Sequence, residues 1–227
     1  MSHSLRTKDF YFCALFILMT GISTIATATT TTTTTPSLPG SYCPDTNILL
    51  IIAEDLSSSL DFVMQSRAAQ TRSDQIEMLA MLNASGITLK QATSRGAGAR
   101  TALLINSVIL SRAKENNTQL LTWFPLLHSA LLTLPYDAAR NAADDAIGRA
   151  EEILQDNQNA DPLDQLGKAR HFLICDDLDI PIQAAIKEQV TLLSHIRQHK
   201  PVATKDFDKL INSLRTALAY VLDNSKT

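Results

Sequence analysis

The sequence predicts an all-α fold of antiparallel helical hairpins, arranged as a bundle or a short solenoid-like array. Three observations support this fold class. Apolar residues recur every three or four positions along most of the chain, which is the spacing of one helix face. No segment after Leu56 alternates apolar and polar residues as a half-buried strand does. A helix-initiating pattern, apolar–Pro–x–x–Ala–Ala, occurs twice in the C-terminal half.

Residues 1–28 have the pattern of a secretory signal peptide. Arg6 and Lys8 precede the apolar run YFCALFILMTGISTI, and small residues two apart follow at Ala26 and Ala28. The run is shorter than the roughly 18–20 apolar residues that span a bilayer, although an uncleaved anchor remains the alternative. We therefore predict a signal peptide at 1–28, a periplasmic or secreted location, and no stable membrane insertion after cleavage.

The segment that follows, TTTTTTTPSLPG, has seven threonines and two prolines and offers no apolar face to bury. We predict that residues 29–44 are a flexible tether. A single all-helical domain is then expected over 45–227.

The charge balance argues against two classes of partner. The chain has 20 Lys and Arg against 23 Asp and Glu, a net charge of −3 at pH 7. Its basic residues form neither a stripe suited to nucleic acid nor a polybasic cluster suited to anionic lipid. We expect no nucleic acid partner, and instead protein partners or self-association.

Cys43 and Cys175 are the cysteines that remain once Cys13 is removed with the signal peptide. An oxidising compartment favours a disulfide between them, which would contribute roughly 4–5 kcal/mol in the chain-entropy model. Two separate thiols are the alternative, because the sequence does not give the distance between their Cα atoms.

Helical periodicity begins after Asp45. The five apolar residues at 48–52 are also compatible with a short strand, because such a run has no usable period. A second helix, SDQIEMLAMLNASG, is expected to be capped by Ser73 and to stop at Gly86. The expected inner face of the first helix consists of Leu49, Ile52, Leu56, Leu60, Val63 and Met64.

Two further helices are predicted before residue 134. In the segment GARTALLINSVILSRAKENN we expect Leu103, Leu104, Val108 and either Leu110 or Ala113 to face inward. Thr118 should cap the next segment, TQLLTWFPLLHSALLTL, in which Pro125 should kink or divide the helix.

The C-terminal half predicts two hairpin-like units, at about 134–176 and 180–222. Their opening patterns begin at Leu134 and Ile180, 46 residues apart. In the first unit, Asp161 is expected to cap a helix that starts at Pro162; in the second, Thr204 takes the capping role, with Asp206 in the first turn. True duplication and convergence on the same hairpin pattern both remain open.

The stretch HFLICDDLDIP, His171 to Pro181, gathers a histidine, a cysteine and three aspartates. A zinc site needs about four well-placed ligands, and no second His/Cys cluster supplies the others. We therefore interpret the stretch as a structural joint. His171 and Cys175 would end one helix, and the aspartates would cap the next helix at Pro181.

His195 and His199 have the i,i+4 spacing of a two-histidine metal site. The metalloprotease helix also has a glutamate after its first histidine, and Ile196 occupies that position here. We interpret both histidines as the last turn of a helix, where positive charge offsets the helix dipole.

Other candidates also have structural interpretations. The acid pairs Asp144–Asp145 and Glu151–Glu152 fit a solvated helix face with i,i+4 arginine partners. The segment RGAGART lacks the third glycine of a dinucleotide fingerprint and is interpreted as a turn that starts a helix. Trp123 is expected in the core or in a groove wall. We predict no catalytic residues, since no nucleophilic serine motif is present. We also predict no cofactor-binding or metal-binding residues, since the dinucleotide and metal patterns above are incomplete.

The segments LLTLPYDAARNAADDAIGRAEEIL, KARHFLICDDLDIPIQAAIKEQVTLL and LINSLRTALAYVL resemble the bacterial YfdX family. The resemblance covers about half the chain, from Thr118 to Leu222. It implies an exported, mostly helical periplasmic protein associated with stress response, with oligomers and a chaperone-like or interaction role. It carries over no catalytic residues.

Three functions are consistent with the sequence. We predict first an exported, periplasmic helical interaction or stress-protective protein without catalytic activity and without a cofactor. The alternative is a small-ligand or metal-binding protein that uses a cavity between helices, near Trp123. A hydrolytic enzyme ranks last, because no nucleophile, base and orienting group can be assembled.

Overall fold

The computed structural model describes residues 38–112, 114–156 and 158–226. The predicted signal peptide and the first part of the predicted tether lie outside these residues. The all-α prediction is confirmed, because helices pack on helices and the described residues form no strand. The helices are α1 (Thr46–Thr71), α2 (Gln75–Thr93), α3 (Ala97–Ser111), α4 (Asn117–Leu121), α5 (Phe124–Leu131), α6 (Ala138–Gln155), α7 (Pro162–Phe172), α8 (Asp176–Arg197) and α9 (Thr204–Asn224).

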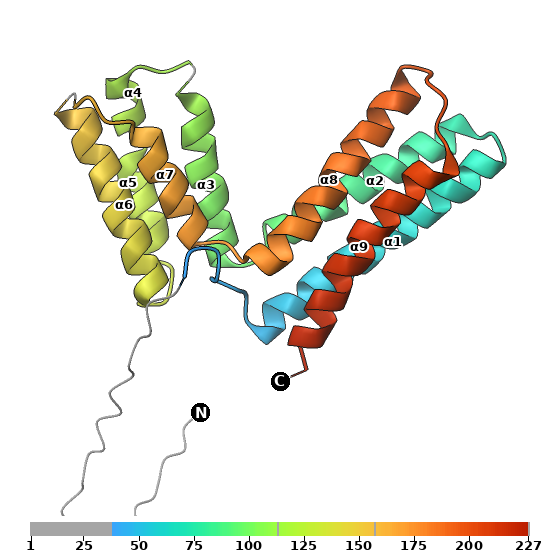
Figure 1. The fold of residues 1–227 in the computed structure, drawn as a ribbon, viewed down its shortest axis with the longest axis horizontal. Coiled ribbons are helices and arrows are strands. Elements are labelled where there is room, and N and C mark those ends of the chain that lie inside the picture. Colours follow the sequence, from blue (N-terminus) through green and yellow to red (C-terminus); the bar gives the residue numbers. More distant parts are fainter. Residues whose placement is uncertain (1–37, 113, 157, 227) are drawn as a thin grey trace, which may run out of the picture. The chain divides into compact units, whose positions relative to one another are not determined.

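The buried apolar side chains form two clusters rather than one. The first core lies among α1, α2, α8 and α9, where α1 and α8 each pack against both α2 and α9 (Figure 1). The second core lies among α3 to α7, with α7 packed against both α3 and α6. The chain crosses between the cores twice, from α2 to α3 and from α7 to α8. None of the described helices is long and apolar enough to cross a membrane.

The first helix contains the whole apolar run at 48–52, so the strand alternative is wrong. Asp45 caps α1 by accepting a hydrogen bond from the Ile48 N–H at 2.9 Å. The expected inner face is buried at Leu49, Ile52, Leu56 and Val63 and half-buried at Leu60, but Met64 is 43% exposed. Small and polar side chains complete the buried face; among them, the Ser66 hydroxyl donates to the Met78 carbonyl of α2 at 2.8 Å.

The second helix begins and ends elsewhere than predicted. Asp74, not Ser73, caps α2 by accepting from the Glu77 N–H at 3.0 Å. The helix does not stop at Gly86 but continues to Thr93. Glycine is needed at this position by the neighbouring helix, because a Cβ at Gly86 would lie 2.5 Å from the amide nitrogen of Gln189 on α8.

The predicted inner face of the third helix is correct only in part. Val108 is buried and Leu104 packs against the second core, as predicted, but Leu103 and Leu110 are 44% and 68% exposed. The apolar run TALLINSVIL has large residues on every side, so the pattern did not identify the whole buried face. Only the packing of α3 against α5 and α7 adds Ala102 and Ile105 to it. Ala113 lies outside the described residues.

Pro125 divides the next helical segment, as predicted: α4 ends at Leu121, and α5 starts at Phe124 with Pro125 in its first turn. The cap of α4 is Asn116 rather than Thr118. Asn116 and Gln119 form a reciprocal capping box, with hydrogen bonds of 2.9 and 3.0 Å.

The two C-terminal helical pairs form close contacts, α6 with α7 and α8 with α9. Asp161 caps α7 at Pro162, as predicted. Pro135 lies before its helix rather than at its first position. Helix α6 begins at Ala138, and Asp137 caps it by accepting from the Arg140 N–H. Thr204 is inside α9 rather than its cap, and the Ala203 N–H donates instead to Asp206 at 3.0 Å.

Candidate functional site: a cavity between the two cores

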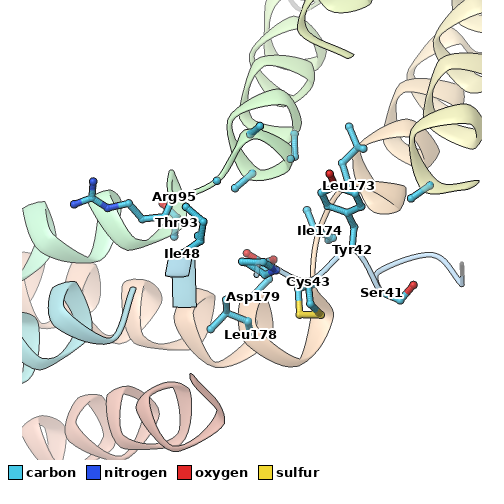
Figure 2. Close-up of a pocket in the computed structure, with 18 of the residues that line it drawn as sticks. Ser41, Tyr42, Cys43, Ile48, Thr93, Arg95, Leu173, Ile174, Leu178 and Asp179 are labelled. Atoms are coloured by element: carbon cyan, nitrogen blue, oxygen red, sulfur yellow. A yellow bond between two sulfur atoms is a disulfide. The ribbon is translucent and has the colours of Figure 1, made fainter. Parts of the chain in front are cut away.

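Helix ends from both cores meet around one cavity of about 580 Å³. The N-terminal ends of α1, α3, α6 and α8 line it, together with the C-terminal ends of α2 and α7 (Figure 2). This volume is in the range of sites that bind drug-sized molecules. Its lining is mainly apolar and includes Ile48, Ile52, Ala102, Leu173, Leu178 and Ile182.

An N-terminal arm, residues 38–45, forms one wall of the cavity. The arm pairs with the joint between α7 and α8: the Gly40 N–H donates to the His171 carbonyl at 2.7 Å, and the Tyr42 N–H donates to the Ile174 carbonyl at 3.0 Å. The Asp176 N–H in turn donates to the Gly40 carbonyl at 2.7 Å. Residues 38–44 were predicted to belong to a flexible tether, but these contacts make them part of the folded structure. Residues 29–37 lie outside the described part.

Glycine is required at position 40 for two reasons. Its φ is +77°, in the left-handed region, and its Cβ would overlap the carboxylate of Asp176. The arm can therefore approach α8 closely enough for the backbone pairing that holds it in place.

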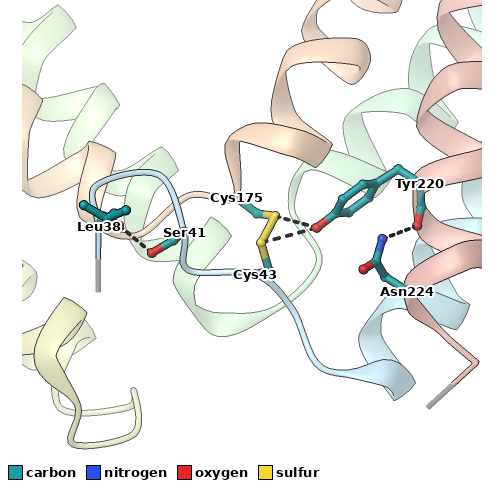
Figure 3. The surroundings of a disulfide bond; sticks show 6 residues. All are labelled: Leu38, Ser41, Cys43, Cys175, Tyr220 and Asn224. Carbon is teal, nitrogen blue, oxygen red and sulfur yellow. Dashed lines mark hydrogen bonds between the residues drawn. A yellow bond between two sulfur atoms is a disulfide. The ribbon is translucent and has the colours of Figure 1, made fainter. Parts of the chain in front are cut away.

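A disulfide joins the arm to the start of α8. The S–S distance between Cys43 and Cys175 is 2.01 Å and their Cα atoms are 4.5 Å apart. The Tyr220 hydroxyl of α9 lies 3.4 Å from the Cys43 sulfur and 3.3 Å from the Cys175 sulfur (Figure 3). Because the bonded sulfurs carry no hydrogen, the hydroxyl is the donor. The disulfide therefore connects the arm, α8 and α9 at the edge of the cavity.

Tyr42 extends from the arm to α3. A Cβ on the buried Gly98 would overlap the Tyr42 ring, so glycine allows the ring to lie against the first turn of α3. Burial raises the pKa of the Tyr42 hydroxyl, and the nearby Asp137 carboxylate raises it further. The phenol is thus held in its neutral form at the cavity wall.

Arg95 fixes the crossing from α2 to α3. Its Nε and Nη2 donate to the two carboxylate oxygens of Asp55 at 2.6 and 3.0 Å, a bidentate pair. The hydrogen bonds to Asp55 raise the pKa of the guanidinium, against the opposing effect of desolvation. Since Asp55 is 8% exposed and lies on α1, the pair ties the crossing to the first core.

The stretch HFLICDDLDIP forms the second crossing, but its parts are arranged differently from the prediction. His171 is in the last turn of α7, as expected, whereas Cys175 is the N-cap residue of α8. The aspartates do not precede the helix: Asp176, Asp177 and Asp179 are its first turn, and Pro181 is inside it. Leu173, Ile174, Cys175, Leu178 and Asp179 all line the cavity.

His195 and His199 do not share a helix face. α8 ends at Arg197, and His199 has a φ of +54°, so it turns away from the helical course. The His199 N–H donates to the Ile196 carbonyl and the Lys200 N–H to the His195 carbonyl, which are the two bonds of a Schellman motif. The described residues contain no group of three or more His, Cys, Asp or Glu side chains placed to hold a metal ion.

The acidic pairs have a partner that the sequence did not indicate. His128 of α5 contacts the Asp144 carboxylate at 2.9 Å through Nδ1 and the Glu151 carboxylate at 3.2 Å through Nε2. The Arg149 Nε donates to the backbone carbonyl of Asp145, not to its side chain. These contacts join α5 to the outer face of α6 and lie away from the cavity.

Two more sequence candidates are resolved by the fold. The segment RGAGART does start a helix, as predicted, and its glycines also line the cavity. Trp123 is half-buried against the second core and donates from Nε1 to Glu115 at 3.0 Å. Trp123 is not among the residues that line this cavity, so the cavity is not at the position that the sequence suggested.

The serine and threonine hydroxyls that line the cavity donate to nearby backbone carbonyls. Ser41 donates to the Leu38 carbonyl, and Thr93 donates to the Lys90 carbonyl at 2.9 Å. The described residues that line the cavity include no histidine. The arrangement therefore provides an apolar volume bordered by charged helix ends, which is suited to binding.

Comparison with protein-family models, with curated proteins and with solved structures finds no match to this chain. The resemblance to the YfdX family therefore stays a prediction, as do the activity and the location.

Proposed function

We propose that the protein is an exported, non-catalytic binding protein that holds one small, largely apolar molecule in the cavity between its two cores. The observation that carries this proposal is the cavity itself, about 580 Å³ in volume and lined mainly by aliphatic side chains. A recessed, mainly apolar pocket of this volume with a few polar groups at its wall is the usual form of a small-molecule site. The disulfide at the cavity wall supports export to an oxidising compartment.

Binding is tested by filling the cavity from within. Ala99 lines the cavity on α3 and is half-buried, so Ala99→Phe would place a ring in the space without removing a core side chain. Ala84, equally half-buried on α2 but not in the cavity, provides the matched control variant Ala84→Phe. The measurement is displacement of a fluorescent apolar dye by a panel of small molecules, followed by native mass spectrometry of the complex.

We expect Ala99→Phe to lower the affinity by about tenfold or more, because the added ring competes for the same volume. Ala84→Phe should bind as the parent does. Equal binding by the two variants, or a parent protein that binds nothing in the panel, would contradict the proposed function.

Exposed apolar residues favour a second function, an interaction or stress-protective role through self-association or protein partners. Ile76 and Ile87 of α2 are 84% and 60% exposed, and Ile180 and Val190 of α8 are 67% and 55% exposed. Exposed apolar side chains mark a protein contact where they gather in one patch, and Ile87 and Val190 follow directly after Gly86 and Gln189, which contact each other. Light scattering of the parent and of an Ile87→Ser, Val190→Ser double variant tests this role: loss of an oligomer only in the variant would support it.

A further inference from the structure

The ionisable side chains around the cavity indicate which class of ligand it takes. Five charged side chains line the cavity. Three are carboxylates at the N-terminal ends of α1, α6 and α8, and two are guanidinium groups that follow α2 or end α7. These residues are Asp45, Asp137, Asp179, Arg95 and Arg170.

The charge of the Arg95 guanidinium is already paired within the fold. Its Nε and Nη2 donate to Asp55, which is not one of the lining residues. Figure 2 shows the Arg95 guanidinium directed away from Tyr42, Cys43 and Asp179. Arg170 is the other guanidinium that lines the cavity. Within the described residues it forms no ion pair with a carboxylate.

The three carboxylates are bound only by neutral donors. Asp45 accepts from the Ile48 N–H, Asp137 from the Arg140 N–H, and Asp179 from the Gln183 side-chain amide at 3.1 Å. Each of these hydrogen bonds uses one oxygen of the carboxylate, and none of the ion pairs in the described chain includes these three residues. Within the described chain, none of the three carboxylates is therefore neutralised by an ion pair.

The helix ends do not reverse this balance. Four N-terminal ends each contribute roughly half a positive charge, and two C-terminal ends each contribute roughly half a negative charge, so the ends add about one positive charge. Together with Arg170 they offset about two of the three carboxylate charges. The cavity therefore keeps a net negative potential next to its apolar wall.

We propose that the ligand is an amphiphilic organic cation, with an apolar body and an ammonium head. This inference rests on the proposed function and adds the charge of the ligand. The body would lie against the aliphatic lining, and the head would lie among the carboxylates that line the cavity. A permanently charged or protonated amine is favoured over a fatty carboxylate, because the carboxylates repel an anion.

The test compares three probes with the same chain, decyltrimethylammonium, decanol and decanoate, each below its micelle concentration. Calorimetric titration of the mature, oxidised protein should give the tightest binding for the cation, by about tenfold over the anion. Asp179→Asn and Asp137→Asn should each weaken cation binding by about three- to tenfold. Arg170→Gln should strengthen it by a similar factor.

The substitutions preserve the fold, because asparagine keeps the shape of aspartate and caps a helix nearly as well. Asp145→Asn is the matched control: it removes the same charge from an exposed position of α6 outside the cavity, and should leave cation binding unchanged. Circular dichroism confirms that each variant is folded.

Each outcome has one meaning. Tighter binding of decanoate or equal binding of decanol, or weakening by Asp145→Asn as great as by Asp179→Asn, overturns the cation assignment while leaving the proposed function in place. If none of the three probes binds, the proposed function fails along with the assignment. A cation preference that depends on Asp179 and Asp137 supports both.

Discussion

Gln189 of α8 lies directly against Gly86 of α2, and its side-chain amide donates to the Leu82 carbonyl at 2.8 Å. Gln189 is 4% exposed, so this is a buried polar contact between α2 and α8 in the first core. The contact requires that the Leu82 carbonyl accept the Gln189 amide in addition to its bond within the helix. It also requires a residue without a side chain where Gln189 passes α2, and Gly86, one turn after Leu82, is that residue.

The first prediction concerns this contact. Gly86→Ala should lower the free energy of unfolding by about 2–3 kcal/mol, although alanine normally favours a helix, because its Cβ would lie 2.5 Å from the Gln189 amide nitrogen. Urea denaturation followed by circular dichroism measures the change. Gly148→Ala on α6 is the matched control; no atom lies within 4 Å of its Cβ, and it should stabilise the protein by about 0.5–1 kcal/mol. Similar effects of the two variants would contradict the proposed role of Gly86.

The second prediction concerns the disulfide, which spans 132 residues of sequence. Intact mass should show the mature protein two hydrogens lighter than its reduced form. The double variant Cys43→Ser, Cys175→Ser should lose roughly 4–5 kcal/mol of stability, because its unfolded chain gains conformational freedom. Hydrogen exchange should become faster at Gly40 and Tyr42, whose amides donate to the joint between α7 and α8. An unchanged mass on reduction would disprove the bond.

The third prediction concerns His199, which has a φ of +54° in the Schellman motif at the end of α8. His199→Gly should raise the free energy of unfolding by about 0.5–1 kcal/mol, since glycine adopts this conformation without a steric penalty. Ser73, with a φ of 57° after α1, should respond in the same way. Gln198→Gly is the control, because its φ of −87° gives glycine no advantage and destabilisation is expected. Thermal denaturation of the three variants provides the comparison.

The fourth prediction concerns pH. Burial, followed by the charges of Asp137 and Asp177 respectively, raises the pKa of Tyr42 and of Tyr220. The unfolded chain releases these protons near pH 10, whereas the folded chain keeps them to higher pH, so the folded state binds more protons in that range. The free energy of unfolding should therefore fall as the pH rises above about 10.

Tyr42→Phe should make this decline shallower, as measured by urea denaturation at a series of pH values. Tyr136→Phe is the control, because Tyr136 is 79% exposed. A decline of the same slope in the parent and in Tyr42→Phe would show that Tyr42 does not contribute to it.

Local features of the fold could be predicted because they depend on neighbouring residues. Pro125 ends one helix and starts another, and Asp161 caps a helix at Pro162, through contacts that extend over three or four positions. The buried face of a helix was harder to predict where apolar residues occur on all its sides, as at Leu103 and Leu110. There, the packing partner selects the buried side.

The sequence by itself determined the helical class, the helix break at Pro125, the cap at Asp161 and the absence of a recognisable catalytic motif. Only the tertiary structure decided that Tyr42, Arg95, Gly98 and Asp179 border one cavity, and that Cys43 meets Cys175. The physical reason is the distance along the chain over which the contacts act. Hydrogen bonds within a helix join residues only a few positions apart, so nearby residues determine them. The cavity, in contrast, depends on the packing of helices that are far apart in the chain and meet where it passes from one core to the other.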